Sequence, residues 1–118
     1  MNQNGPQKAS VLIVDDSPAN LDLLSTYLDD NGLDVETALD GRGALEQAQA
    51  IQPDIILLDI MMPGLDGYET CRRLKSSEAT KEIPVIFMTA LSEIANKIEG
   101  FEAGGIDYIV KPFDFREI

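Results

Sequence analysis

An α/β domain built on a parallel sheet is the fold class that this sequence predicts, and three observations lead to it. Five short apolar runs alternate with segments whose apolar residues repeat at helical spacing. This alternation is typical of parallel strands joined by crossover helices. The chain has 118 residues, the size of one domain, and 44% of them are hydrophobic, enough to bury a core.

The first predicted strand covers residues 11–14, and we expect the polar residues 1–10 before it to form a flexible tail. Ser17 and Pro18 then predict a helix N-cap followed by a proline at the first helical position. Asn-Gly at 31–32 ends this helix. Its apolar positions recur at helical spacing: Leu21, Leu24 and Leu28.

A weaker strand is predicted over Asp34–Ala38, and a second helix begins at Gly41 and is ended by Pro53. Residues 55–58 form a continuous aliphatic run. Such a run is typical of a central parallel strand that is covered on both faces. The next segment, residues 60–66, is predicted to be a loop.

We interpret Asp-Gly at 66–67 as a turn that leads into the third helix. The fourth strand, residues 85–88, comes next, and a fourth helix separates it from the fifth strand, residues 108–110. The helices are marked by Tyr68, Cys71 and Leu74, and by Ile94, Ile98 and Phe101. A fifth helix would begin at Asp114, so we expect it to be largely missing from a chain that ends at Ile118.

The amino-acid composition argues against several classes of function. The net charge of −12 argues against binding to nucleic acid or to anionic membranes, which need basic surfaces. The sequence shows no membrane helix and no signal peptide, so we expect a cytoplasmic protein. The single cysteine, Cys71, allows no internal disulfide and is interpreted as a half-buried helix residue. The chain has no histidine, which excludes histidine catalysis and an internal phosphohistidine.

Polar residues end four of the five predicted strands. Asp15 and Asp16 follow the first strand, Asp59 the third, Thr89 the fourth and Lys111 the fifth. The flavodoxin-like strand order 2-1-3-4-5 would place the first and third strands side by side, with the ligand site at the carboxyl ends of the strands. A lone aspartate there is usually a cap or turn residue. The complete set instead predicts that the three aspartates share one cleft.

Three carboxylates in one cleft repel each other unless positive charge relieves them. Oxygen ligands without histidine or cysteine indicate Mg²⁺, Mn²⁺ or Ca²⁺, and Lys111 would add a fixed charge. Such a site suits phosphoryl transfer, which depends on positioning and on charge neutralisation. In this hypothesis Asp59 is the nucleophile that forms an acyl phosphate, and Thr89 and Lys111 meet the phosphoryl oxygens.

Four segments resemble the signature segments of response-regulator receiver domains, the phosphoacceptor modules of two-component signalling. They are Val-Asp-Asp at 14–16, Leu-Leu-Asp-Ile-Met-Met-Pro-Gly-Leu-Asp-Gly at 57–67, Met-Thr-Ala at 88–90 and Lys-Pro-Phe at 111–113. The resemblance runs from about Val11 to the end of the chain and implies a receiver domain over residues 11–118.

The resemblance implies a role for each acidic position. Asp59 would be the phosphoacceptor. Asp16 would bind Mg²⁺ directly, and Asp15 would act largely through water. The backbone carbonyl of Met61 would complete the metal site, with Mn²⁺ as an alternative ion.

The resemblance also implies a switch and partners. Thr89 and Tyr108 would form the switch pair, and the peptide bond between Lys111 and Pro112 is expected to be cis. The phosphoryl donor would be a histidine kinase or a histidine phosphotransfer protein. An output domain would follow Ile118 or be a separate protein, and phosphorylation could promote a homodimer.

Other functions are less well supported. An aspartate-based phosphatase would have Asp-x-Asp after the first strand, where this chain has Asp15, Asp16 and Ser17. A nucleotide or flavin binder would have a glycine-rich loop there, and Gly-Arg-Gly at 41–43 is more simply a turn into a helix. A passive docking module is the remaining alternative. We therefore expect a receiver that catalyses only its own phosphorylation and dephosphorylation.

Overall fold

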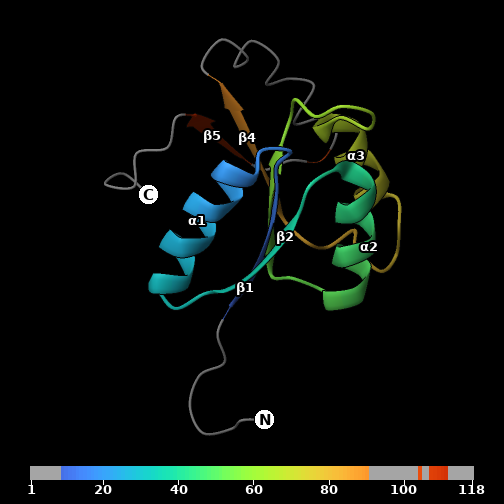
Figure 1. The fold of residues 1–118 in the computed structure, drawn as a ribbon. Helices are drawn as coiled ribbons and strands as arrows, with labels where there is room; N and C mark the ends of the chain where they lie inside the picture. Colours follow the sequence, from blue (N-terminus) through green and yellow to red (C-terminus); the bar gives the residue numbers. More distant parts are fainter. Residues whose placement is uncertain (1–8, 91–103, 105–106, 112–118) are drawn as a thin grey trace, which may run out of the picture.

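The computed structural model describes residues 9–90, 104 and 107–111, and at 89, 90 and 107–111 it describes the backbone alone. The described strands form one parallel sheet in the order β2-β1-β3-β4-β5 (Figure 1). The predicted fold class and strand order are confirmed. The elements are β1 (Ser10–Val14), α1 (Pro18–Asp30), β2 (Asp34–Ala38), α2 (Gly41–Ile51), β3 (Ile55–Asp59), α3 (Gly67–Lys75), β4 (Val85–Ala90) and β5 (Asp107–Lys111).

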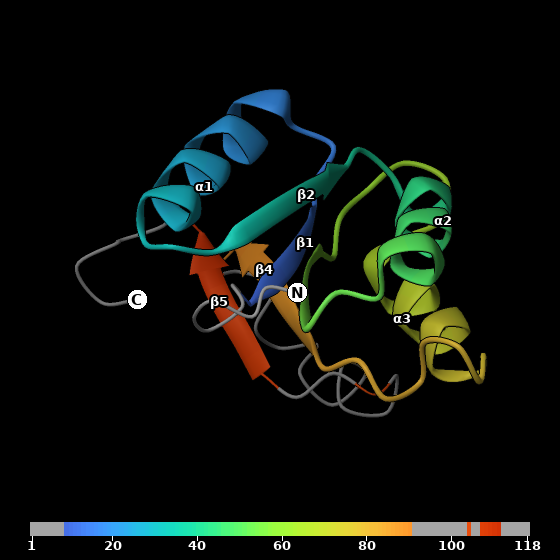
Figure 2. The ribbon, with the colours of Figure 1, turned by 90° about the horizontal axis from the view of Figure 1, so that it is seen from below.

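Helices cover both faces of the sheet. In Figures 1 and 2, α1 lies on one face and α2 and α3 lie on the other. Side chains along β1 alternate between these faces, because successive strand residues point to opposite sides. Leu12 and Val14 belong to the apolar cluster that includes residues of α2 and α3, and Val11 and Ile13 belong to the cluster that includes residues of α1. The central strands are apolar on both sides for this reason.

Side chains cap the first turns of α1 and α2. Ser17 Oγ accepts a hydrogen bond from the Asn20 backbone N–H at 3.3 Å. Asp40 Oδ1 accepts one from the Gly43 backbone N–H at 2.7 Å. Both caps satisfy an N–H that has no partner within the helix. The predicted N-cap at Ser17 is confirmed.

Asp66 caps α3, where the sequence analysis indicated only a turn. Its Oδ1 accepts a hydrogen bond from the Glu69 backbone N–H at 2.9 Å, and Gly67 is already the first helical residue. The turn interpretation is therefore wrong. Aspartate followed three residues later by glutamate is a helix-start signal.

Some boundaries differ from the predicted ones. β1 begins at Ser10, inside the expected tail, because Ser10 pairs with Asp34 of β2. Ser10 N also donates to Asp54 Oδ2 at 2.7 Å, and Asp54 N donates to Ser10 O at 2.9 Å. β4 is two residues longer than predicted at its carboxyl end. β5 is one residue longer than predicted at each end. The predicted fourth and fifth helices lie outside the described residues. Of the helices that are described, none has the length and apolar character that crossing a membrane requires.

Cys71 is completely buried rather than half-buried. Its exposed fraction is 0%, and it packs in the cluster between α3 and the sheet. In the same cluster the rings of Tyr68 and Phe87 meet edge to face, with centroids 5.1 Å apart. Burial raises the pKa of the Cys71 thiol to about 11, against the opposing influence of Lys75. The thiol is therefore protonated and unreactive at neutral pH.

Candidate functional site

Three carboxylates meet at the carboxyl ends of β1 and β3. Val14 and Leu58 are paired in the parallel ladder, so Asp15, which follows β1, and Asp59, which ends β3, lie at the same edge of the sheet. One carboxylate oxygen from each of Asp15, Asp16 and Asp59 lies within 4.8 Å of the other two. The structure thus brings together the three aspartates that the sequence analysis singled out.

The Asp15 carboxylate is buried and hydrogen-bonded to the start of α1. Its exposed fraction is 0%. Oδ1 accepts a hydrogen bond from the Ser17 backbone N–H at 2.9 Å, and Oδ2 accepts one from Asn20 Nδ2 at 3.3 Å. The Asp15 backbone N–H donates to Ala38 O at 3.1 Å, at the end of β2. Asp16 is exposed, so an arriving cation meets it from solvent.

Asp59 ends β3 and is 4% exposed. The backbone that follows it is held from two sides. The Ile60 N–H donates to Met88 O on β4 at 3.2 Å, and the Gly67 N–H donates to Ile60 O at 2.9 Å. The second bond brings the start of α3 back to the end of β3. The backbone at Asp59 is therefore positioned by β3, β4 and α3 together.

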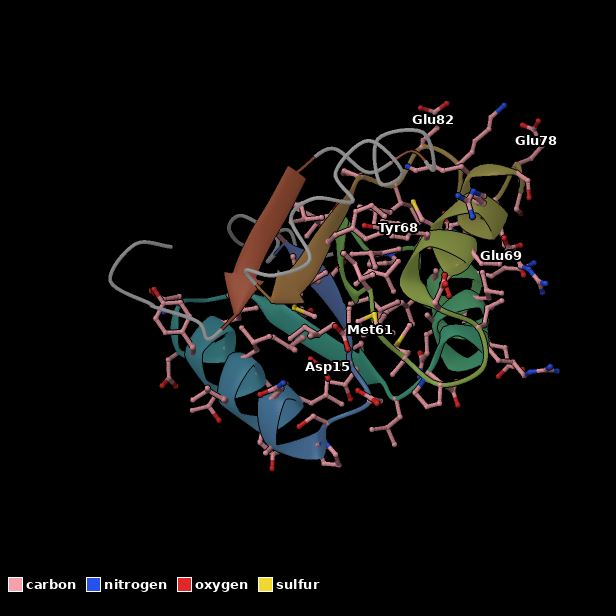
Figure 3. All side chains as sticks on the ribbon, turned by 90° about the horizontal axis from the view of Figure 1, so that it is seen from above. Asp15, Met61, Tyr68, Glu69, Glu78 and Glu82 are labelled. Carbon is pink, nitrogen blue, oxygen red and sulfur yellow. The ribbon has the colours of Figure 1, made fainter. Side chains whose placement is uncertain are left out.

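Met61 lies in the loop between β3 and α3, and its side chain is 64% exposed. Figure 3 shows Asp15 and Met61 at the same edge of the sheet. The predicted metal ligand is the backbone carbonyl of Met61. For this carbonyl to bind a metal ion, the backbone of the loop must lie at the site, whereas the Met61 thioether need not.

The other predicted residues are described only in part. The backbone of Thr89 comes directly after the residue that pairs with Asp59, and Lys111 ends β5, the neighbour of β4. Their backbones thus lie at the carboxyl ends of the strands, as predicted. The side chains of Thr89, Tyr108 and Lys111, and the whole of Pro112, lie outside the described residues.

Two residues at this edge were missed by the sequence analysis. Asn20 reaches Asp15 from the first turn of α1, and its position one turn after a strand-end carboxylate was an available signal. Gly67 lies against the acceptor backbone. A Cβ built on it would overlap the Asp59 carbonyl oxygen and lie 2.7 Å from Ile60 Cα. That close approach depends on where α3 packs, and no local pattern reveals it.

The chemistry of the donors suits a hard cation. Carboxylates this close repel each other, and binding of a divalent ion relieves the repulsion. The donor set contains oxygen and no nitrogen or sulfur, which is the preference of Mg²⁺. Mg²⁺ typically uses one or two carboxylates and keeps its other positions for water and phosphate oxygens. The chemistry of the cluster therefore fits this ion.

The chain is similar in sequence to known response regulator receiver domains. Residues 11–118 match the response regulator receiver domain family. The DNA-binding dual master transcriptional regulator RpaA of Synechocystis sp. is 47% identical over 108 residues, which are 92% of this chain and 45% of RpaA. The chain thus spans less than half the length of this curated relative.

Solved structures share the fold. The chemotaxis protein CheY4 of Vibrio cholerae superposes with a TM-score of 0.87 at 37% identity, over 92% of this chain and 90% of CheY4. The receiver domain of the sensor histidine kinase PA1611 from Pseudomonas aeruginosa superposes with a TM-score of 0.84 at 32% identity, over 94% and 91% of the two chains. That structure holds a magnesium ion in its active site cleft. From its sheet, its carboxylate cluster and these relatives, the chain belongs to the response regulator receiver domains of two-component systems.

Proposed function

We propose that Asp59 accepts a phosphoryl group from the phosphohistidine of a partner protein. The observation that carries the proposal is the meeting of three carboxylates within 4.8 Å at the ends of β1 and β3. Receiver domains bind Mg²⁺ at an acidic pocket. In this chain the ion would be held by Asp15, Asp16, Asp59 and the backbone carbonyl of Met61, with Mn²⁺ as a substitute.

The proposed transfer is a nucleophilic displacement at phosphorus. A carboxylate oxygen of Asp59 attacks the phosphorus, an O–P bond forms and the P–N bond of the donor breaks. The donor ring, protonated on its second nitrogen, leaves with the electron pair of the broken bond and becomes a neutral imidazole. Mg²⁺ held by the three aspartates would supply positive charge that offsets the charge of the phosphoryl oxygens. The hydrogen bonds around Ile60 hold Asp59 in place, and Thr89 and Lys111 contact the remaining phosphoryl oxygens in this proposal.

The phosphoryl donor in this proposal lies outside these 118 residues, which contain no histidine. Receiver domains interact with histidine kinases or phosphotransfer proteins and generally act as signalling domains rather than as enzymes. We propose that the chemistry of this chain is limited to gain and loss of its own phosphoryl group.

The phosphoryl group would act through a shift between two conformations. In this proposal Thr89 moves toward the phosphoryl group and Tyr108 follows, which would remodel the face formed by the predicted fourth helix and β5. A cis peptide bond before Pro112 would place Lys111 at the site. An output domain after Ile118, a separate output protein or a homodimer would respond to that surface, and the whole protein would act in the cytoplasm.

The direct test is intact-mass spectrometry after incubation with acetyl phosphate, with and without Mg²⁺. We expect the wild type to gain one phosphoryl group when Mg²⁺ is present. Asp59→Asn should gain none, because it lacks the nucleophile. Asp66→Asn is the matched control, since it changes an aspartate of the same loop and asparagine also caps helices well. A folded Asp59→Asn protein that is phosphorylated like the wild type would refute the proposal.

A further inference from the structure

In the described part of the chain, two donors of different kinds reach the Asp15 carboxylate. The Ser17 backbone N–H binds Oδ1 at 2.9 Å, and the Asn20 side-chain amide binds Oδ2 at 3.3 Å. Both donors come from the turn that starts α1. A backbone donor cannot be removed by changing a side chain, so the amide of Asn20 is the one contact of this pair that depends on residue type.

Two donors on two oxygens restrict rotation of the carboxylate. A carboxylate with one hydrogen-bonded oxygen can still pivot as a whole about that bond, whereas hydrogen bonds to both oxygens restrict the orientation of its plane. Asp15 has an exposed fraction of 0%, so its orientation depends on protein groups. The adjacent Asp16 is exposed. The Asp15 carboxylate thus lies on the buried side of the cluster, and Asp16 lies on its solvent-exposed side.

An amide is well suited to this position. It donates a hydrogen bond and adds no charge to the three carboxylates. A lysine or arginine would bring a positive charge that competes with the cation, and an aspartate would add a fourth negative charge. Asn20 therefore orients Asp15 and preserves the negative charge that attracts a divalent ion.

We propose that Asn20 is a positioning residue of the metal site, acting through Asp15. This inference rests on the proposed function, because it assumes that the carboxylates bind Mg²⁺. Groups that hydrogen-bond to metal ligands orient those ligands, and removing such a group typically lowers metal affinity about 10-fold to 100-fold.

Removal of the Asn20 side chain leaves the helix start intact. The bond between the Asn20 backbone N–H and Ser17 Oγ, 3.3 Å long, involves no Asn20 side-chain atom. Alanine also has a higher helix propensity than asparagine. Asn20→Ala therefore changes the hydrogen bond to Asp15 while α1 keeps its N-cap.

The same helix provides a matched control. Asn31, the C-cap of α1, donates through its Nδ2 to Tyr27 O at 2.8 Å in an exposed position. Asn31→Ala removes the same kind of side-chain amide bond at the end of the helix away from Asp15. A loss of Mg²⁺ affinity that reflects general weakening of α1 would appear in both variants.

The experiment is calorimetric titration of the unphosphorylated full chain with Mg²⁺, for the wild type, Asn20→Ala and Asn31→Ala. We expect the dissociation constant to rise about tenfold in Asn20→Ala and to stay unchanged in Asn31→Ala. In phosphorylation by acetyl phosphate, the Mg²⁺ concentration for half-maximal rate should rise in Asn20→Ala. The rate at saturating Mg²⁺ should be preserved.

Three results would overturn the inference. One is an unchanged Mg²⁺ dissociation constant in Asn20→Ala, even if its metal-free melting temperature falls, because that describes a purely structural role. Another is an equal loss of affinity in Asn31→Ala. The third is a wild type that binds no Mg²⁺, which would refute the proposed metal site itself. The first two results would refute only the role of Asn20.

Discussion

Gly67 packs directly against the backbone of Asp59. Any side chain at position 67 would overlap the Asp59 carbonyl oxygen, and its Cβ would lie 2.7 Å from Ile60 Cα. The Gly67 N–H meanwhile donates to Ile60 O at 2.9 Å. The first residue of α3 is thus packed against, and bonded to, the segment that carries the proposed phosphoacceptor.

Gly67→Ala should therefore impair both stability and phosphorylation. The overlapping atoms belong to backbone, which relaxes less easily than the end of a side chain, so we expect a loss of about 1–3 kcal/mol. The shift should also move Asp59 and slow phosphorylation by acetyl phosphate, even at temperatures where the variant is folded. Urea denaturation and intact-mass kinetics measure the two effects.

Gly41→Ala is the control for that prediction. Its Cβ would overlap Thr70 Oγ1 and lie 3.0 Å from Leu65 Cβ, so it disturbs side chains between α2 and α3 rather than the Asp59 backbone. We expect a comparable loss of stability with a phosphorylation rate near that of the wild type. Equal slowing in both variants would show that the Gly67 contact has no special effect on the acceptor.

Mg²⁺ should stabilise the folded chain, because the carboxylates converge only in the folded state. A ligand that binds only the native state at 100 times its dissociation constant adds about 2.7 kcal/mol to the free energy of unfolding. We expect the melting temperature to rise along a Mg²⁺ titration, and the rise to shrink strongly in Asp16→Asn. An identical rise in Asp16→Asn would remove this residue from the proposed metal site.

Asp66→Ala should weaken the start of α3. The Asp66 side chain accepts the Glu69 N–H at 2.9 Å, and loss of such a cap typically costs about 1 kcal/mol. Asp66→Asn should cost little, since asparagine caps equally well. The free energies of unfolding in urea distinguish these variants. If Asp66→Ala were as stable as the wild type, the cap would contribute nothing in solution.

Cys71 should make stability depend on alkaline pH. Burial raises the pKa of its thiol from the usual 9.0 to about 11 in the folded protein. The stabilising contribution of the protonated thiol is complete below pH 9 and is lost as the pH rises through about 11. Between these values the wild type should lose more stability than Cys71→Ala, as measured by urea denaturation at each pH.

The same burial should protect Cys71 from thiol reagents. Its exposed fraction is 0%, so at neutral pH a disulfide reagent should label the folded chain no faster than the chain opens. Labelling in concentrated urea should be rapid. Fast labelling of the folded protein would contradict the packing described for α3.

Much of the fold and site followed from local patterns in the sequence. Aliphatic runs bounded by turn residues predicted the strands, because parallel strands covered on both faces bury nearly every side chain. The polar residues that end those runs predicted the aspartate cluster, because parallel strands present their carboxyl ends at one edge. This reasoning needs only the order of residues along the chain, and it located Asp15, Asp16 and Asp59.

Only the tertiary structure decided which contacts hold these aspartates in place. The approach of α3 to β3 makes a side chain at Gly67 impossible, and the position of α1 brings Asn20 to Asp15. Packing also buried Cys71 completely. Each depends on how a helix packs against the sheet, and that packing is set by how the side chains of the whole core fit together. The sequence by itself determined which groups meet at the site, and the packing determined how firmly and in which orientation they are held.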